Sequence, residues 1–449
     1  METSIVFVLF GAFIGLLLLG APISISLGVS AVTAFLVLDD NPIKLVQIAF
    51  TSVGSFPLMA LPSFILAGAL MEAAGVSKRL VTLAESFAGP MTGGISCATV
   101  IACMFFGAIS GSGPATTAAV GMLMIPAMAN RGYDKGYASA ITASSGGLGV
   151  VIPPSIPMVI FGISGMNIQP PAEAVAQFGS FQTVSIPKLF VAGFFPGLVI
   201  SVSLMIMNYF LCKKYGYKGL TDKWSGSKIV QAVKGGIWAI MAPIVILGGI
   251  YSGMFTPTES AIVAIFYTLF VGFFVHRELK MPAIMKALET TTWLTGRVLL
   301  ILFTATVFGR LLVENQIPAI VAKAMLDFTT NPYLIWAMII FFLLFVGMFM
   351  ETLATIMILT PVLLPVMYNL GIDPIHFGIV LVCCCEIGFA TPPLGENMFI
   401  ASGVARTTLE EISWNALPFV FVSVLVVFLI AYFPALTLWL PNVLGAMFG

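Results

Sequence analysis

The sequence predicts an all-α polytopic membrane protein built from two inverted repeats. Of its 449 residues, 59% are hydrophobic and 8% are charged, and the mean hydropathy is +1.08. Soluble domains carry roughly a quarter charged residues, so this composition indicates many membrane-spanning helices. Ten residues of the first half recur in the second half at a constant separation of 239 positions, which indicates an internal duplication. Glycine and proline interrupt an apolar run in both copies, which predicts broken helices.

The duplication is clearest between residues 107–154 and residues 347–393. The two segments align without a gap. The identical pairs are Ala115 and Ala354, Thr116 and Thr355, Pro126 and Pro365, Met128 and Met367, Asn130 and Asn369, Gly132 and Gly371, Asp134 and Asp373, Gly149 and Gly388, Pro153 and Pro392, and Pro154 and Pro393.

The composition excludes several classes of function. The net charge is zero and no basic cluster is interleaved with aromatic residues, which argues against nucleic-acid binding. No GxSxG, HExxH or P-loop pattern is present, so we expect a transport protein and not an enzyme or an ATP-driven pump. The six cysteines have no metal or disulfide spacing and are expected to be packing residues. The N-terminus lacks the basic region of a signal peptide, so the first apolar run is expected to stay as a span.

In the first repeat, residues 1–212, apolar runs mark spans and amphipathic runs mark helices at the membrane surface. The expected spans are 7–20, 22–38, 56–74 and 189–212, with an amphipathic helix at 42–53 and an amphipathic piece that ends at Pro90.

Two parts of the first repeat are expected to be irregular. Residues 92–130 carry SGSGPA at 110–115, and neither flanking arm is long enough to cross a bilayer comfortably. We therefore expect a re-entrant helical hairpin there. Residues 137–165 are long enough to cross, but their glycines and prolines at 146–157 predict a broken transmembrane helix.

The second repeat, residues 236–449, is expected to follow a basic linker at 213–235. The linker carries six lysines and a lone Asp222, which indicates that it is cytoplasmic. The second re-entrant hairpin is expected at 333–370 and the second broken span at 375–405. The remaining spans are 236–251, 260–275, 291–313 and 417–440, with amphipathic segments at 276–286 and 317–328.

The charges of the short loops predict the orientation. If the linker is cytoplasmic, the other basic loops also lie inside and the acidic turn at Asp39 and Asp40 lies outside. This holds only if each hairpin returns to the side from which it came. The first hairpin then opens inward and the second outward, so the repeats are inverted, with about ten crossings and both termini periplasmic. The alternative, in which both hairpins cross fully, has about twelve crossings.

The irregular segments predict the functional site. Non-helical backbone at membrane depth persists only where protein, water or ions satisfy it, and such segments in inverted repeats point to a midplane transport site. Free carbonyls can bind Na⁺, and helix N-termini favour an anion. The alternative is that Gly and Pro only kink packed helices. The oxygen-bearing candidates are Ser110, Ser112, Gly149 and Ile152 in the first repeat and Thr352, Thr355, Gly388 and Thr391 in the second.

A few charged residues interrupt the apolar runs. Glu351 and Glu386 are costly there and could relay a proton, line a cavity or reach interfacial water. Arg297 and Arg310 could reach the membrane surface, and Arg310 could pair with Glu314 four residues on. Binding of a substrate carboxylate is the alternative for both arginines.

These residues resemble the large membrane subunit (DctM type) of tripartite ATP-independent periplasmic (TRAP) transporters over essentially the whole chain. The resemblance rests on five strings in order: FFGAISGSGPATTAAVG at 105–121, VIPPSIPMVIFG at 151–162, GMFTPTESA at 253–261, LTPVLLPVMYNLGIDPIHFG at 359–378 and GFATPPLGENMF at 388–399. It implies an elevator-type permease in the bacterial inner membrane with Na⁺ as coupling ion. Its implied partners are a small membrane subunit of about four helices, expected as a separate polypeptide, and a soluble periplasmic substrate-binding protein.

The resemblance also implies particular ligands. Gly107, Ser110, Gly149 and Ile152 would hold one Na⁺, and Gly347, Gly388, Thr391 and Leu394 would hold another, many through backbone oxygens. The substrate would lie near Ser112, Thr116, Thr355 and Asn397. Some members carry a second serine where this chain has Gly113, so any role of that hydroxyl does not transfer.

We therefore expect a Na⁺-coupled importer of a small organic anion: a C4-dicarboxylate, another carboxylate or a sulfonate. No cofactor beyond the coupling ion is expected. The main alternative is a stand-alone Na⁺/carboxylate symporter that needs no binding protein. A membrane enzyme or a channel is a third hypothesis, disfavoured by the lack of an intramembrane His/Asp/Glu cluster and of a ring-forming polar span.

Overall fold

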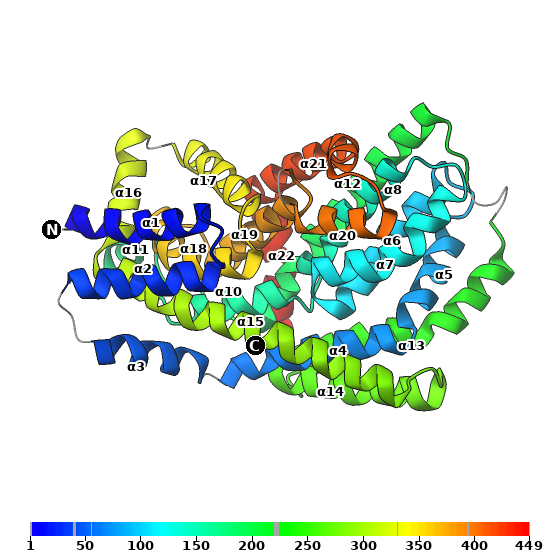
Figure 1. The fold of residues 1–449 in the computed structure, drawn as a ribbon, viewed down its shortest axis with the longest axis horizontal. Helices are drawn as coiled ribbons and strands as arrows, with labels where there is room; N and C mark the ends of the chain where they lie inside the picture. Colours follow the sequence, from blue (N-terminus) through cyan, green and yellow to red (C-terminus); the bar gives the residue numbers. More distant parts are fainter. Residues whose placement is uncertain are drawn as a thin grey trace.

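The regular structure of the described chain is helical. The computed structural model describes residues 2–38, 42–54, 56–219, 224–329, 331–392 and 395–448, and these ranges contain helices and no strand. The acidic turn at Asp39 and Asp40 and part of the basic linker lie outside the described residues. The helices form two groups, which we call the long-helix layer and the hairpin domain (Figure 1).

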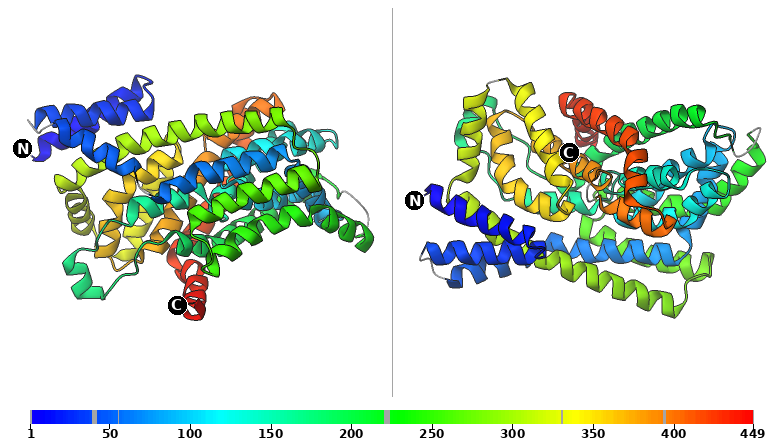
Figure 2. Two further views of the ribbon diagram at one scale, coloured as in Figure 1. Left: turned by 90° about the horizontal axis from the view of Figure 1, so that it is seen from below. Right: turned by 45° about the horizontal axis from the view of Figure 1, so that its top comes forward.

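The long-helix layer lies along one side of the molecule (Figure 2). Within it α4 packs against α14 and α15, and α2 packs against α15. Each half of the chain contributes three of its helices. They are α1 (Glu2–Leu18), α2 (Ile23–Val37) and α4 (Ala60–Ala73) from the first half, and α13 (Gly226–Tyr251), α14 (Pro257–Phe270) and α15 (Met281–Glu314) from the second. Helix α3 (Pro42–Val53) and the 3-10 helix η1 (Phe56–Met59) join α2 to α4, and a π-helical turn, η2 (Val271–Val275), follows α14.

The hairpin domain contains two helical hairpins. The first is α6 (Gly94–Ser110) with α7 (Gly113–Ala129), and the second is α17 (Pro332–Gly347) with α18 (Thr352–Asn369). The first tip turns at Gly111, whose φ of +63° suits a residue without a Cβ. The side chain of Ser112 then caps α7 by accepting from the amide of Ala115.

The two broken spans start with related caps. The first consists of α8 (Lys135–Gly146), α9 (Leu148–Val151) and α10 (Ile156–Gly165), and the second of α19 (Pro374–Phe389) and α20 (Glu396–Ala405). Asp134 and Asp373, which the duplication pairs, accept from the amides of Tyr137 and Ile375 at 2.9 and 2.8 Å. The first span bends by 42° at its break, where two prolines offer no backbone donor.

Contacts between the halves are crosswise. Helix α7 of the first hairpin packs against α20 of the second broken span, and α18 of the second hairpin packs against α10 of the first broken span. Each hairpin therefore contacts the far arm of the other half's broken span. This exchange is the arrangement expected of inverted repeats that enclose one site.

The remaining helices connect or cover the two groups. Helix α5 (Val76–Ala88) contacts both α13 and α6, and α16 (Ile317–Phe328) contacts both α15 and α18. They correspond to the predicted amphipathic segments. Helices α12 (Ile186–Tyr215) and α21 (Leu409–Tyr432) both pack against α19 and α8. Helix α22 (Ala435–Phe448) packs on α12. The short helix α11 (Ala172–Phe178) precedes α12 in the chain.

Two predictions from hydropathy were wrong in detail. The segment 213–235 is helical at both ends, because α12 runs to Tyr215 and Ser225 caps an α13 that begins at Gly226. Lysines in the last turn of α12 interact favourably with the partial negative charge at the helix C-terminus. The helix therefore extends beyond its apolar run. The predicted span 417–440 is two helices, because Pro434 between α21 and α22 has no amide hydrogen.

Length and composition alone mark fewer candidate spans than the roughly ten crossings expected from the sequence. Within the described residues, six helices are long and apolar enough to span a membrane, or up to eight if two bent helix pairs are each counted as one span. Helices α1 and α2, predicted as spans, have 17 and 15 residues and fall short of that length. The division of the chain into repeats at 1–212 and 236–449 stays a prediction.

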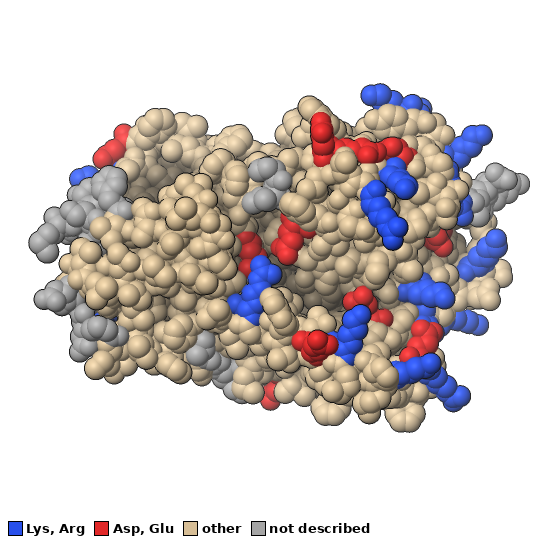
Figure 3. All heavy atoms as spheres, viewed as in Figure 1, with Lys and Arg blue, Asp and Glu red and all other residues tan. Residues whose placement is uncertain are grey.

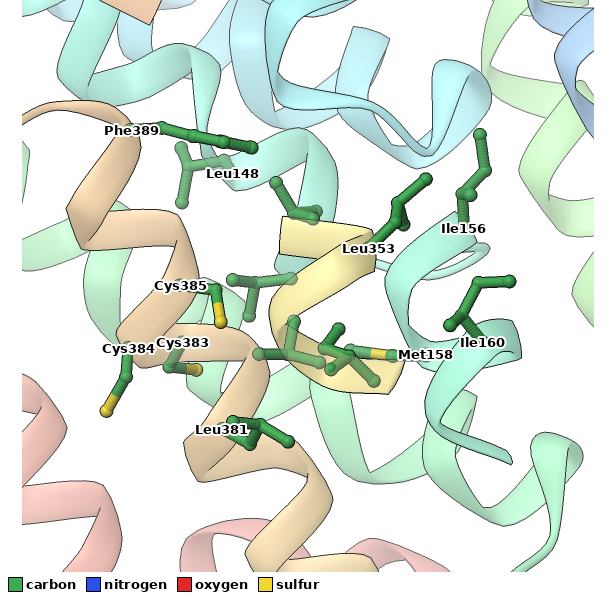
Figure 4. Packing of buried hydrophobic residues seen from close by; sticks show 14 of the residues in the cluster. Leu148, Ile156, Met158, Ile160, Leu353, Leu381, Cys383, Cys384, Cys385 and Phe389 are labelled. Carbon is green, nitrogen blue, oxygen red and sulfur yellow. The ribbon is translucent and has the colours of Figure 1, made fainter. Parts of the chain in front are cut away.

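Buried apolar side chains fill the hairpin domain. Figure 4 shows Leu148 of the first broken span beside Phe389 at the end of α19. Cys383, Cys384 and Cys385 follow one another on α19 and are fully buried. Glycines allow the hairpins to approach the broken spans closely, because they have no Cβ. A Cβ on Gly107 would lie only 2.6 Å from the Cα of Gly149.

Replacing Gly107 with alanine should therefore destabilise the protein. We expect Gly107→Ala to lower the apparent midpoint of thermal unfolding in detergent, because overpacking costs about 1–3 kcal/mol. Gly403→Ala on α20 is the matched control, since nothing lies within 4 Å of that position and it is exposed. Alanine there should leave the midpoint unchanged or raise it. Equal midpoints for both variants would contradict the close approach of the two backbones.

Candidate functional site

The first hairpin tip lies directly against the first broken span. Besides the contact of Gly107 with Gly149, the hydroxyls of Ser110 and Thr116 are 2.9 Å apart. The Thr116 hydroxyl donates to the carbonyl of Ser112 at 2.8 Å. A Cβ on Gly149 would lie 2.7 Å from that same carbonyl oxygen. The structure thus brings together three of the four residues predicted for the first Na⁺ and two of those predicted for the substrate.

The chain around the proline pair completes this half of the site. The amide of Ile156 donates to the carbonyl of Gly111 at 3.2 Å, which joins the broken span to the hairpin tip. Ile152, the fourth predicted ligand, ends α9 in an extended conformation. Its side chain meets α12, where a Cβ on Gly197 would lie 2.5 Å from it. Ile152 can therefore offer an ion only its backbone oxygen.

The second hairpin tip repeats this contact. A Cβ on Gly388 would overlap the backbone of Gly347, so these two predicted ligands touch. The hydroxyl of Thr391 donates to the carbonyl of Ile387 at 2.6 Å, which leaves its lone pairs for another partner. Leu394, the remaining predicted ligand, lies outside the described residues.

Asn397 joins the two halves of the site. Its amide nitrogen donates to the carbonyl of Ala143 in α8 at 3.1 Å. A Cβ on Gly113 at the first tip would lie 3.4 Å from that nitrogen. Asn397 is therefore beside Ser112 and Thr116, as predicted for a substrate ligand. Thr355, the other predicted substrate ligand, belongs to the second tip, where its hydroxyl donates to the carbonyl of Glu351 at 3.0 Å.

Charged side chains surround a hollow between the long-helix layer and the hairpin domain (Figure 3). Arg297 of α15 lies 3.7 Å from Glu351, the residue that precedes α18 at the second tip. This ion pair connects the two groups of helices. Arg310 instead pairs with Glu314 at 2.9 Å, which confirms the local pairing considered from the sequence.

A basic groove of about 690 Å³ lies between α5, α13 and the loop after α7. Lys78, Arg131 and Lys228 line it together with Arg79, which bonds Glu278 at 2.8 Å. The Arg79 guanidinium lowers the pKa of that carboxyl. Most of these residues were predicted to lie on one side of the membrane, and the fold places them together.

The sequence analysis missed a group of buried hydroxyls in the first broken span and hairpin. A buried polar group without a partner costs about 1–3 kcal/mol, so such atoms mark places for water, an ion or a ligand. The only sign of these hydroxyls in the sequence was the pair Ser144 and Ser145 inside the apolar run AITASSGG. Among the described residues, the buried side-chain oxygens without a partner include those of Thr117, Ser139, Ser144, Ser145 and Thr352, with one oxygen each of Glu386 and Asn397.

All six cysteines are free and buried, which fits a packing role. The described residues contain no group of three His, Cys, Asp or Glu side chains that could hold a metal ion. Any ion at the hairpin tips would therefore depend on hydroxyl and backbone oxygens.

The fold and the sequence both have known relatives. The chain is similar to the YdaH transporter of Alcanivorax borkumensis, with a TM-score of 0.61 and 14% identity over 87% of each chain. That likeness concerns the fold alone. The isethionate TRAP transporter permease protein DctMQ of Oleidesulfovibrio alaskensis is 44% identical over 96% of this chain, which spans 66% of that protein's length.

Two further relatives match over nearly their whole length. The C4-dicarboxylate TRAP transporter large permease protein DctM of Rhodobacter capsulatus is 36% identical over 98% of this chain and 99% of its own. The sialic acid large permease SiaM of Vibrio cholerae is 35% identical over 96% and 97%. The profile of the DctM component of tripartite ATP-independent periplasmic transporters matches residues 10–436. The chain therefore belongs to the DctM family, the large permease proteins of TRAP transporters.

Proposed function

We propose that this chain is the permease subunit of a Na⁺-coupled, binding-protein-dependent secondary transporter that imports a small organic anion. The observation that carries the proposal is the crosswise packing of α7 on α20 and of α18 on α10. It joins both hairpin tips and both broken spans into one domain. Broken helices at such a repeat interface are where secondary transporters hold substrates and coupling ions.

Each hairpin tip offers a place for one Na⁺. The Gly107–Gly149 and Gly347–Gly388 contacts bring the backbone of a tip against the backbone of a break. Ser110 and Thr391 add hydroxyl oxygens to these two places. Each net positive charge that enters down about 100 mV contributes roughly 2.3 kcal/mol from the electrical term alone. A net entry of two charges, after the charge of the substrate is subtracted, would support steep accumulation.

Helix N-termini at the tips and breaks suit an anionic substrate. Helices α7, α10, α18 and α20 all begin there, and helix N-termini carry partial positive charge. The relatives named for isethionate, C4-dicarboxylate and sialic acid all carry anions of this kind. We infer a carboxylate or a small sulfonate as substrate.

Transport would proceed by an elevator movement of the hairpin domain against the long-helix layer. Helices α5 and α16 each contact both groups of helices. They would act as the arms that connect the moving domain to the long-helix layer. The Arg297–Glu351 pair also crosses the boundary and would have to break or form in each cycle. The Arg297 side chain is 47% exposed and that of Glu351 is 13% exposed, so movement would require another partner or water for this carboxylate.

The partners we propose are a small membrane subunit and a soluble periplasmic binding protein, and the site of action is the bacterial inner membrane. The name DctMQ of the isethionate relative, of which this chain covers 66%, is consistent with a further membrane segment in that protein. A stand-alone symporter remains the second candidate, and one uptake measurement separates the two.

Uptake of a radiolabelled organic anion into liposomes should require Na⁺ and the binding protein. The liposomes would contain this chain and its small subunit, with isethionate and a C4-dicarboxylate as first substrates. We expect uptake only with an inward Na⁺ gradient and added binding protein. Uptake with Na⁺ alone would favour the stand-alone symporter, and uptake unaffected by Na⁺ would refute the coupling.

Removal of the Thr391 hydroxyl should weaken the second Na⁺ site. Thr391→Val keeps the shape of the side chain, so we expect folding to be retained while the Na⁺ concentration for half-maximal uptake rises about tenfold, the effect of roughly one lost ligand. Thr306→Val is the matched control, since its hydroxyl donates only within α15, to the carbonyl of Leu302 at 2.8 Å. An unchanged Na⁺ dependence in Thr391→Val would remove this side chain from the site.

The inverted-repeat topology that we propose predicts that the two capping aspartates lie on opposite faces of the membrane. Cysteines at Asp134 and Asp373 should react with a membrane-impermeant maleimide from the cytoplasmic and the periplasmic side, respectively. Background labelling should be low because the native cysteines are buried. Reaction of both positions from the same side would refute the inverted topology and the periplasmic termini.

A further inference from the structure

Glu386 is a buried carboxylate that the two proposed Na⁺ places do not use. It lies on α19 with 4% of its surface exposed, and one of its carboxylate oxygens, Oε2, has no hydrogen-bond partner. The other oxygen lies against Gly147, the residue between α8 and α9, where a Cβ would overlap it. A carboxylate in such a place needs a compensating positive charge.

A cavity of about 10 Å³ lies beside this carboxylate. That volume is roughly the space of one water-sized sphere. Glu386, Ser144 and Ser423 supply its polar lining, and apolar side chains supply the rest. Ser144 is 5% exposed and its hydroxyl also has no partner. Two unpartnered and nearly fully buried polar groups therefore face one space of the size of a single ion.

The end of α19 adds negative potential. Helix α19 ends at Phe389, next to the lining residue Ala390. Helix C-termini carry partial negative charge and hold cations in broken-helix transporters. The cavity also joins the two repeats, since Ser144 comes from the first and Glu386 from the second.

We propose that Glu386, Ser144 and Ser423 form a further site for a monovalent cation of the size of Na⁺, separate from the hairpin tips. The inference rests on the proposed Na⁺ coupling and adds an ion to it. One carboxylate among neutral oxygens balances a single positive charge, whereas a divalent ion would lack a second carboxylate.

A bound cation accounts for the geometry better than a proton does. A proton on Glu386 would remove the charge but would give the Ser144 hydroxyl no partner. A cation in the cavity would coordinate both groups at once. It would also hold α8 against α19, so the ion would fix the relative position of the two broken spans.

Direct Na⁺ binding to the purified full-length chain tests the site. Radioactive ²²Na⁺ would be titrated in detergent with choline as the balancing cation. We expect Glu386→Gln, which keeps the shape and removes the charge, to bind one ion fewer per chain than the wild type. Ser144→Ala should weaken one binding step about tenfold, as loss of roughly one ligand does.

Ser139→Ala is the matched control for both variants. Ser139 lies on α8 with a buried and unpartnered hydroxyl, as Ser144 does, but it does not line the cavity. Its Na⁺ binding should equal that of the wild type. If Glu386→Gln does not fold, Ser144→Ala with its control decides the question alone.

The outcomes separate this inference from the proposed function. If both variants bind Na⁺ as the wild type does, the further site is refuted while coupling at the hairpin tips stands. If Glu386→Gln keeps every ion but changes only the pH dependence of uptake, Glu386 carries a proton and the inference is also refuted. If the wild type binds no Na⁺, the Na⁺ coupling fails and this site fails with it.

Discussion

The structure depends on one constraint: backbone amides and carbonyls at membrane depth must find partners where the helices break. The first tip meets it through the bond from the Ile156 amide to the Gly111 carbonyl, and α10 begins under the cap of Ser155. At the second break the hydroxyl of Thr391 bonds the carbonyl of Ile387. The bond from Ile156 to Gly111 requires that tip and break lie in contact, and the glycine pairs Gly107–Gly149 and Gly347–Gly388 permit close approach. A Cβ on Gly107, Gly149 or Gly388 would overlap neighbouring backbone atoms.

The crosswise contacts follow from the same need. Neither hairpin can satisfy its tip alone, and each lies instead between its own broken span and the far arm of the other. The hairpin domain is thereby a single unit to which both halves of the chain contribute. The arm helices α5 and α16 and the Arg297–Glu351 pair are its links to the long-helix layer. An elevator movement would shift this unit while its internal contacts stay intact, which suits sites whose ligands come from backbone and hydroxyl oxygens.

Several charged side chains of this protein form ion pairs. Arg310 and Glu314 form a neighbouring pair on one helix, and Arg79 and Glu278 pair beside the basic groove. Glu351 faces Arg297 across the hollow. Glu386 lacks such a partner and faces Ser144 and Gly147. The unpartnered hydroxyls near it are the feature that the proposed functions of the hairpin tips leave unexplained.

The sequence by itself determined the helical membrane class, the duplication and the positions of the breaks, because hydropathy, glycine and proline act over a few residues. It also indicated the caps Asp134 and Asp373 as a related pair. It did not determine that α13 begins at Gly226 or that Pro434 divides the last apolar run, since caps and single prolines outweigh hydropathy there. Only the tertiary structure placed Asn397 beside Gly113 and Glu386 beside Gly147. These partners are far apart along the chain, and their contact depends on how whole helices pack, which no local pattern records.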